Sequence, residues 1–220
     1  MTGLAPGAAG DERPWARLVD RRSVNRGDRR RAALLGALDD LLREQTLEQV
    51  NVAEISARAG VSRSAFYFYF ESKATAVLAL MAQLYDDASE ATDRLVKAEG
   101  DPRQRIRGVI ETLFDSVDRT PHTYRALLQA RAAHPAVGEL WDAGRAEFAA
   151  LVAEMSVRER IGARAPDDDA APDASALAAV LLDLNDHALE RYALGAGPPR
   201  ERHIDTLVHL WVAGIYGSPA

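Results

Sequence analysis

The most informative segment of this chain is Gly60-Val61-Ser62-Arg63-Ser64-Ala65-Phe66-Tyr67-Phe68-Tyr69-Phe70-Glu71-Ser72-Lys73. Shortly before it, Asn51 with Glu54 three residues later forms a capping box that begins a helix. Gly60 can take the positive φ that ends this helix in a tight turn, and Ser62 can cap a second short helix over residues 63–69. Two short helices joined by a glycine turn are the helix-turn-helix pattern, whose second helix enters the DNA major groove.

The aromatic run 66–70 cannot face a single core, because successive helical residues are about 100° apart. Phe66 and Phe70 share one face and are expected to be buried, which leaves Tyr67 and Phe68 exposed beside Arg63. A basic side chain and exposed aromatics at the start of a helix suit phosphate contacts and packing on thymine methyl groups. The alternative is a short amphipathic core helix that makes no DNA contact.

Two segments resemble a known family. Gly60-Val61-Ser62-Arg63, the aromatic run and Ser72-Lys73 resemble the signature of the TetR family of transcriptional regulators. The run Asp205-Thr206-Leu207-Val208-His209-Leu210-Trp211-Val212, followed by Ile215-Tyr216-Gly217, is similar to the EthR-like branch. The resemblance implies an all-α protein of about nine helices, with an N-terminal three-helix DNA-binding domain and a larger C-terminal helical domain for ligand binding and dimerisation.

Candidate DNA contacts lie on and around the helix pair. They are Asn51, Ser62, Arg63, Ser64, Ala65, Tyr67, Phe68, Tyr69 and Lys73. Lys73 matches a family position and follows Ser72, which can cap the next helix. Because a helix N-terminus and a lysine charge both favour an anion, we expect a phosphate contact there; a solvated lysine is the alternative.

Charge is unevenly distributed along the chain. The net charge is −6, yet residues 1–73 carry 12 basic against 10 acidic side chains while residues 74–220 carry 15 against 23. Eight arginines fall within residues 13–31, so residues 1–27 are interpreted as a disordered basic arm that reaches over the DNA backbone or into the minor groove. A solvated tail is the alternative.

Domain boundaries follow from the helix pattern. Residues 28–72 are expected to form the DNA-binding domain and residues 73–220 the ligand-binding and dimerisation domain. Helices are predicted over residues 28–45, 51–59, 63–69, 73–97, 102–118, 121–133, 137–161, 173–194 and 200–216. Residues 162–172, with Asp167-Asp168-Asp169, are predicted to be a solvated acidic loop rather than a metal site.

A ligand site is predicted among the large aromatics of the C-terminal domain. Phe114, Trp141, Phe148 and Trp211 lie on three predicted helices and could instead fill an ordinary core. EthR-like proteins have an aromatic channel for elongated hydrophobic molecules, and Trp141, Phe148 and Trp211 match its lining while Asn185 matches an asparagine that hydrogen-bonds ligands. Phe148 replaces a tryptophan of those relatives, and Leu182 replaces a second asparagine.

The last two predicted helices are apolar on more than one stripe, which indicates a second surface to cover. The resemblance implies that they form the interface of a homodimer that binds a palindromic double-stranded DNA operator. The expected function is that of a repressor released by a hydrophobic small-molecule effector. The alternative is a DNA-binding dimer without an effector, whose C-terminal domain serves only dimerisation or partner recruitment.

Other functional classes find little support in the sequence. The five histidines are dispersed, no Gly-rich phosphate loop is present, and there is no cysteine, so no catalytic, metal-binding or cofactor-binding residues are predicted. No apolar run is long enough for a membrane helix, and the N-terminus lacks the apolar segment of a signal peptide. We therefore expect a cytoplasmic protein that is not an enzyme.

Overall fold

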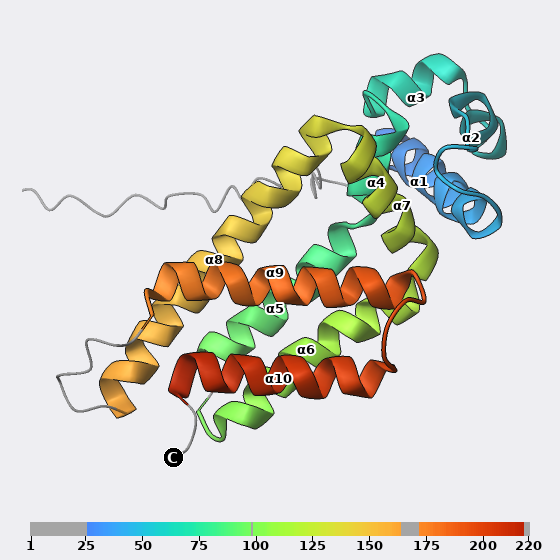
Figure 1. Ribbon diagram of the computed structural model, residues 1–220. Coiled ribbons are helices and arrows are strands. Elements are labelled where there is room, and N and C mark those ends of the chain that lie inside the picture. The colour runs from blue at the N-terminus through green and yellow to red at the C-terminus, as the bar shows by residue number, and fades with distance from the viewer. Residues whose placement is uncertain (1–25, 98, 164–171, 218–220) are drawn as a thin grey trace, which may run out of the picture.

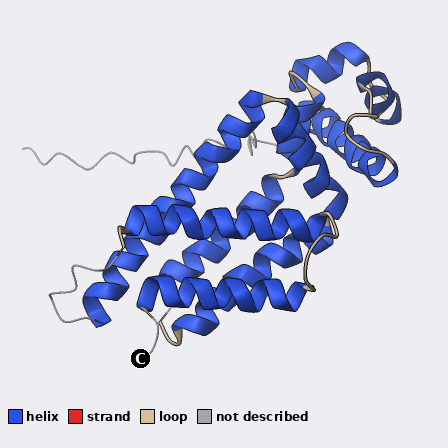
Figure 2. Cartoon of the chain, in the orientation of Figure 1, coloured by secondary structure: helices blue, strands red, loops and turns tan. Residues whose placement is uncertain are grey.

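The computed structural model describes residues 26–97, 99–163 and 172–217, and within these residues the regular structure is helical throughout, with no strand (Figure 2). The helices are α1 (Arg26–Glu44), α2 (Val52–Arg58), α3 (Arg63–Tyr69), α4 (Lys73–Leu80), α5 (Ala82–Lys97), α6 (Pro102–Arg119), α7 (Pro121–Ala133), α8 (Pro135–Ala163), α9 (Ala174–Ala193) and α10 (Arg200–Tyr216). The predicted all-α fold class is confirmed.

Helices α1 to α3 form a small unit at one end of the molecule (Figure 1). Asn51 Oδ1 accepts the Glu54 backbone N–H at 2.9 Å, Gly60 has φ 67°, and Ser62 Oγ accepts the Ala65 N–H at 3.2 Å. These caps and the turn are as predicted from the sequence. Only half of the capping box forms, because the Glu54 carboxylate accepts from Gln45 Nε2 rather than from the Asn51 backbone.

The start of α1 differs from the prediction. The helix begins at Arg26, two residues before the expected cap Asp28, so Asp28 lies within the helix. Its apolar stripe is placed as predicted: Leu34, Leu38 and Leu41 are buried. These leucines pack in one core with Phe66 of α3 and with Phe70, the residue that follows α3, and these two side chains therefore hold α3 against the rest of the unit.

The expected single helix over residues 73–97 is divided at Met81 into α4 and α5. The backbone N–H of Met81 bonds both Val77 O at 3.0 Å and Leu78 O at 3.1 Å, which tightens the last turn of α4. The Met81 side chain is almost fully buried, so the residue between α4 and α5 packs into the core. Counting α4 and α5 separately gives one more helix in the described residues than the nine expected.

The body of the molecule consists of α4 to α10, in which α9 and α10 lie side by side on one face with α5 and α6 behind them (Figure 1). Asp101 and Asp173 cap α6 and α9 as predicted. Thr120 does not cap α7, because its hydroxyl donates to Ser116 O instead. Helix α8 extends to Ala163, into the expected acidic loop, and Asp167 to Asp169 lie outside the described residues. None of the described helices is long and apolar enough to cross a membrane.

Candidate DNA-binding surface and internal cavity

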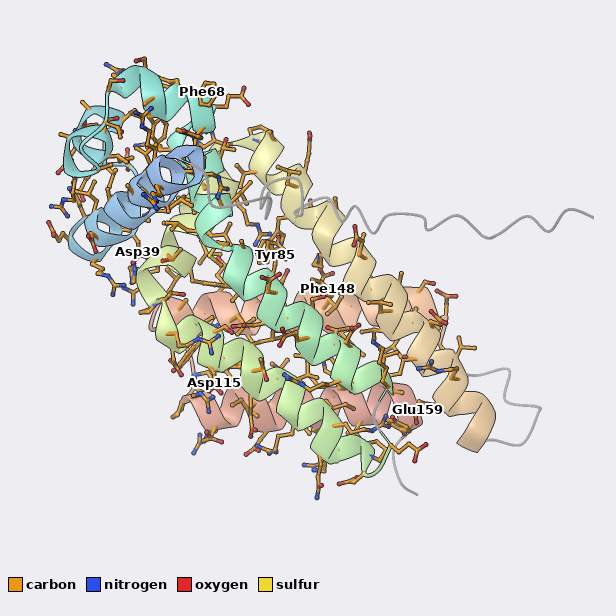
Figure 3. All side chains as sticks on the ribbon, turned by 180° about the vertical axis from the view of Figure 1, so that it is seen from behind. Asp39, Phe68, Tyr85, Asp115, Phe148 and Glu159 are labelled. Carbon is orange, nitrogen blue, oxygen red and sulfur yellow. The ribbon has the colours of Figure 1, made fainter. Side chains whose placement is uncertain are left out.

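Helix α3 presents two of its aromatic side chains to solvent. Phe68 is 81% exposed and Tyr67 is 49% exposed, whereas Phe66 is fully buried. In the view from behind, Phe68 lies on α3, in the helix-turn-helix unit at one end of the molecule (Figure 3). A large apolar side chain with this exposure has no role in the core of the chain, which is consistent with a contact surface on α3.

The polar groups of α3 lie beside these aromatics. Arg63 is exposed, its Nη2 donates to the Tyr67 hydroxyl at 3.5 Å, and its guanidinium carbon is 5.8 Å from the centre of the Tyr67 ring. Ser62 and Ser64 are exposed and their hydroxyls are 2.9 Å apart. Arg63 is thus held over a ring by weak contacts that a phosphate or a base edge can replace.

The remaining predicted DNA-contact residues are half-buried or have a polar atom that is already bonded within the protein. Asn51 is exposed, but its Oδ1 caps α2. Ala65 is half-buried and has no polar side-chain atom, and Tyr69 is half-buried with its ring edge-on to Phe68 at 5.0 Å. Their DNA contacts stay predictions.

Lys73 has a different role from the one expected. Its Nζ donates to three backbone carbonyls, Leu47 O at 2.5 Å, Glu48 O at 3.0 Å and Val50 O at 2.7 Å. An ammonium group has three N–H donors, so all of them are engaged within the protein. Lys73 therefore stabilises the segment between α1 and α2. A contact between its ammonium group and a phosphate would require breaking one of these three hydrogen bonds.

Helix α7 joins the helix-turn-helix unit to the body. His122 Nε2 is 2.8 Å from Asp39 Oδ1 of α1, and the Thr123 hydroxyl donates to the same oxygen at 3.1 Å. Farther along α7, Gln129 Oε1 accepts the backbone N–H of Leu47 at 3.0 Å. These polar contacts connect α7 to both α1 and the segment that Lys73 orders.

An apolar cavity lies inside the body and offers about 90 Å³ to the centres of water molecules. Its lining comes from helices α5 to α10: Leu84, Tyr85, Ala88, Thr92, Leu95, Val109, Leu113, Tyr124, Trp141, Arg145, Phe148, Val152, Leu182, Asn185, Asp186, Leu189 and Trp211. A volume of this size holds several waters or a compact apolar group. Figure 3 shows Tyr85 and Phe148 near each other in the middle of the body, on α5 and α8.

Four of the five predicted ligand-binding residues, Trp141, Phe148, Asn185 and Trp211, line this cavity. Phe114 does not: it is fully buried on the other side of α6, with its ring centre 5.1 Å from that of Tyr192 and 5.9 Å from that of His203. Its neighbour Leu113 faces the cavity instead. One residue along a helix changes the facing direction by about 100°, which is why a prediction by residue type missed the correct face.

Two indole groups fix the polar atoms of the cavity. Trp211 Nε1 donates to Asn185 Oδ1 at 3.1 Å, and Trp141 Nε1 donates to Asp186 Oδ2 at 3.2 Å. Burial raises the pKa of Asp186 above its ordinary value, and it also raises the pKa of the nearby Tyr85 hydroxyl. The sequence analysis missed Asp186, Tyr85, Tyr124 and Arg145, although Arg145 follows Trp141 by one helical turn and Asp186 directly follows Asn185.

The outer face of α9 and α10 exposes apolar side chains: Val180 is 54% exposed, Leu184 38% and Leu210 38%. Val180 and Leu184 are four residues apart and so share one stripe of α9. No group of histidines and carboxylates in the described part of the chain is arranged to hold a metal ion.

A helix-turn-helix unit with an exposed second helix, joined to a helical body that contains an apolar cavity, defines the class of helix-turn-helix transcriptional regulators. Residues 34–80 match the model of the bacterial regulatory proteins of the tetR family, and residues 106–217 match that of the C-terminal domain of the transcriptional regulator EthR. The chain belongs to the TetR family, in its EthR-like branch.

Individual relatives agree with this assignment. The HTH-type transcriptional regulator EthR of Mycolicibacterium smegmatis is 34% identical over 197 residues, covering 87% of this chain and 88% of the relative. EthR of Mycobacterium tuberculosis is 34% identical over 199 residues, covering 87% and 89%. The solved structure of Thermus thermophilus FadR, a TetR family transcriptional repressor in complex with lauroyl-CoA, has a TM-score of 0.65 at 20% identity and covers 86% of this chain and 97% of that chain. That likeness supports the fold.

Proposed function

We propose that this regulator is a ligand-responsive repressor that binds a palindromic operator as a homodimer and is released by a hydrophobic small molecule. The observation that carries the proposal is the apolar cavity, whose wall combines Trp141, Phe148 and Trp211 with the amide of Asn185. A largely apolar site with a few placed polar groups is the usual form of a small-molecule site. The proposal includes neither an enzymatic activity nor a cofactor. We propose that the protein acts in the cytoplasm.

The DNA-binding part of the proposal rests on α3. Arg63, Ser64, Tyr67 and Phe68 are exposed together, and the core holds α3 from behind through Phe66 and Phe70. We propose that residues 28–72 form the DNA-binding domain. A dimer is needed because two recognition helices about 34 Å apart enter successive major grooves. We propose that the exposed apolar side chains of α9 and α10 form its interface. Residues 1–27, as a basic arm, would add phosphate contacts.

The ligand-binding part of the proposal rests on Asn185. Its Oδ1 accepts from Trp211, and its Nδ2 has no hydrogen-bond partner among the described residues. Because Asn185 is only 3% exposed and lines the cavity, a ligand oxygen is the natural acceptor for these two N–H donors. A hydrophobic effector with one carbonyl or ether oxygen fits this arrangement.

The coupling between the cavity and α3 can follow two routes, one through α4 and α5 and the other through α7. Helix α4 begins at Lys73, which orders the segment before α2, and α5 continues its path to the cavity residue Tyr85. Helix α7 places Tyr124 on the cavity wall directly after His122 and Thr123, which bond Asp39 of α1. A ligand that displaces Tyr85 or Tyr124 would tilt the helix-turn-helix unit, and a coupling of about 1–3 kcal/mol is typical of such systems.

The test compares operator binding with and without a ligand. A compound that raises the melting temperature of the purified protein is first found in a panel of hydrophobic molecules. We expect this compound to weaken operator binding by about 5- to 150-fold, which corresponds to the coupling above. Asn185→Trp fills the cavity and should abolish compound binding while the protein stays dimeric.

An unchanged operator affinity at saturating compound would leave the second candidate, a DNA-binding dimer whose C-terminal domain serves only dimerisation or partner recruitment. That candidate has one observation in its favour: the cavity of about 90 Å³ is small for a ligand pocket. Failure of Asn185→Trp to affect compound binding would place the compound elsewhere.

A further inference from the structure

The carboxylate of Asp186 is incompletely bonded at the cavity wall. Its Oδ2 accepts from Trp141 Nε1 at 3.2 Å, and the Arg145 Nε is 3.9 Å away, beyond hydrogen-bond distance. No other hydrogen bond to Asp186 is present among the described residues. The side chain is only 25% exposed, and an ionised carboxylate offers about four acceptor sites. A half-buried carboxylate with one hydrogen-bond donor and a guanidinium at 3.9 Å has acceptor sites left for a ligand that brings another donor.

The charges around Asp186 leave one negative charge in excess. Three carboxylates, Asp142, Asp183 and Asp186, lie near two guanidinium groups, Arg131 and Arg145. Both guanidiniums have other partners, because Arg145 pairs with Asp183 and Arg131 lies over the Trp141 ring at 4.7 Å. One added cation would neutralise this group, whereas an added carboxylate would increase the excess to two.

Two aromatic rings of the cavity wall lie near the carboxylate, and the N–H edge of one of them, Trp141, bonds it. The rings of Tyr85 and Trp141 are 5.7 Å apart at an angle of 60°, and both residues line the cavity with Tyr124. Aromatic faces attract an ammonium group through their quadrupole, and this attraction is larger where water is excluded. The rest of the lining, including Leu84, is mainly apolar and suits a hydrocarbon tail.

We propose that the effector of this protein is a lipophilic amine, whose protonated nitrogen donates to Asp186 beside the rings of Tyr85 and Trp141 while its apolar tail occupies the cavity. The inference rests on the proposed function and adds the chemical class of the ligand. It distinguishes three parts of the site: the apolar wall retains the tail, the amide of Asn185 donates to an oxygen of the ligand, and Asp186 selects the cationic head group.

The test uses three probes with the same tail, phenylbutylamine, phenylbutanol and phenylbutyrate, each titrated calorimetrically against the full chain. We expect the amine to bind about tenfold or more tightly than the alcohol, because the ammonium brings a positive charge to the carboxylate as well as a hydrogen bond, whereas the alcohol brings only the hydrogen bond. The phenylbutyrate carboxylate should bind most weakly. Asp186→Asn should reduce the amine to the affinity of the alcohol and leave the alcohol unchanged.

The matched control is Glu154→Gln, which removes the same charge from an exposed position of α8 that does not line the cavity. It should keep the preference for the amine. Equal binding of amine and alcohol by the wild type, or an amine preference that survives Asp186→Asn, overturns the inference and leaves the proposed function intact. Binding of none of the three overturns the inference; only if the wider panel of hydrophobic compounds also fails does the proposed function fail with it.

Discussion

The surface of α3 and the cavity of the body are both built from aromatic side chains, but from contacts of very different sequence separation. The hydrogen bonds that shape α3 join residues two to four apart, such as Ser62 with Ala65 and Arg63 with Tyr67. The bonds that shape the cavity join residues far apart: Trp211 with Asn185 across 26 positions and Trp141 with Asp186 across 45. The surface of α3 is therefore a local structure, whereas the cavity is formed by the packing of helices that are distant in the sequence.

This difference has a functional consequence. Within α3, Phe66 is buried whereas Arg63, Ser64, Tyr67 and Phe68 are exposed, so one helix separates the residue that holds it from the residues proposed to contact DNA. Around the cavity, by contrast, one residue can serve both purposes: Trp211 lines the cavity and, at 2% exposed, is also part of the hydrophobic core. Substitutions in α3 should accordingly divide into stability effects and binding effects, whereas substitutions around the cavity should mix the two.

The largest effect is expected for Phe66→Ala compared with Phe68→Ala. Phe66 is fully buried, so its truncation should lower the free energy of unfolding of the helix-turn-helix unit by about 3–5 kcal/mol. Phe68, two residues on and 81% exposed, should change stability by less than about 0.5 kcal/mol but weaken operator binding. Urea denaturation and fluorescence anisotropy measure the two quantities. Equal destabilisation by both variants would show that α3 does not have separate residues for stability and for DNA binding.

The next effect concerns Lys73 and Arg63. Lys73→Ala removes three hydrogen bonds from a charged donor and should lower the free energy of unfolding by about 2–3 kcal/mol. It should leave the dependence of log K on log salt unchanged, because all three N–H donors of the ammonium are engaged by backbone carbonyls. Arg63→Ala should flatten that dependence by about 0.9 if it contacts phosphate, or alter sequence preference if it contacts a base. A flatter salt dependence for Lys73→Ala would restore the phosphate contact expected from the sequence.

The sequence predicted the turn and the caps of the helix-turn-helix unit because their signals are local, although α1 begins two residues earlier than expected. Caps at Asn51 and Ser62, the positive φ at Gly60 and the burial of Phe66 and Phe70 all follow from residues within a few positions of each other. Lys73 is the exception within this region. Its partners lie 23 to 26 positions away, and spacing along one helix cannot reveal them.

The cavity could be predicted only in part. Residue matches to the EthR-like branch placed Trp141, Phe148, Asn185 and Trp211, all of which line it. Phe114 was placed wrongly because an aromatic residue type does not specify the facing direction on α6. The charged wall was missed because Asp186 and Arg145 are ordinary surface residue types, and only the packing of α8 against α9 brings them to the cavity.

The third prediction compares a buried with an exposed hydrogen bond in the body. Trp211→Phe removes the donor to Asn185 Oδ1 and should lower the free energy of unfolding by about 1–2 kcal/mol, because a buried acceptor is left unpaired. Tyr192→Phe removes an exposed bond to Asp118 and should have an effect of less than about 0.5 kcal/mol. Urea midpoints at equal m-values measure both. A larger loss for Tyr192→Phe would indicate that the Trp211 to Asn185 bond contributes little to the packing of α9 and α10.

The smallest effect concerns Asp39 of α1, whose carboxylate connects the helix-turn-helix unit to His122 and Thr123 of α7. Burial favours the neutral acid, but hydrogen bonds from His122, Arg43 and Thr123 lower the pKa of Asp39 below its ordinary value. Because the pKa is lower in the folded than in the unfolded state, the stabilisation is fully present above about pH 4 and is lost as the pH falls through the folded pKa.

Asp39→Asn should therefore destabilise the protein modestly at neutral pH, by about 1 kcal/mol or less for a partly exposed group, and this difference from wild type should shrink below about pH 4. Asp40→Asn is the matched control, since Asp40 is adjacent and exposed, and its effect should be smaller at neutral pH. The same pair tests the coupling route. If α7 transmits the ligand signal through His122 and Thr123, Asp39→Asn should reduce the change in operator affinity caused by a cavity ligand, while Asp40→Asn should not. An unaltered ligand response in Asp39→Asn would assign the transmission to α4 and α5 alone.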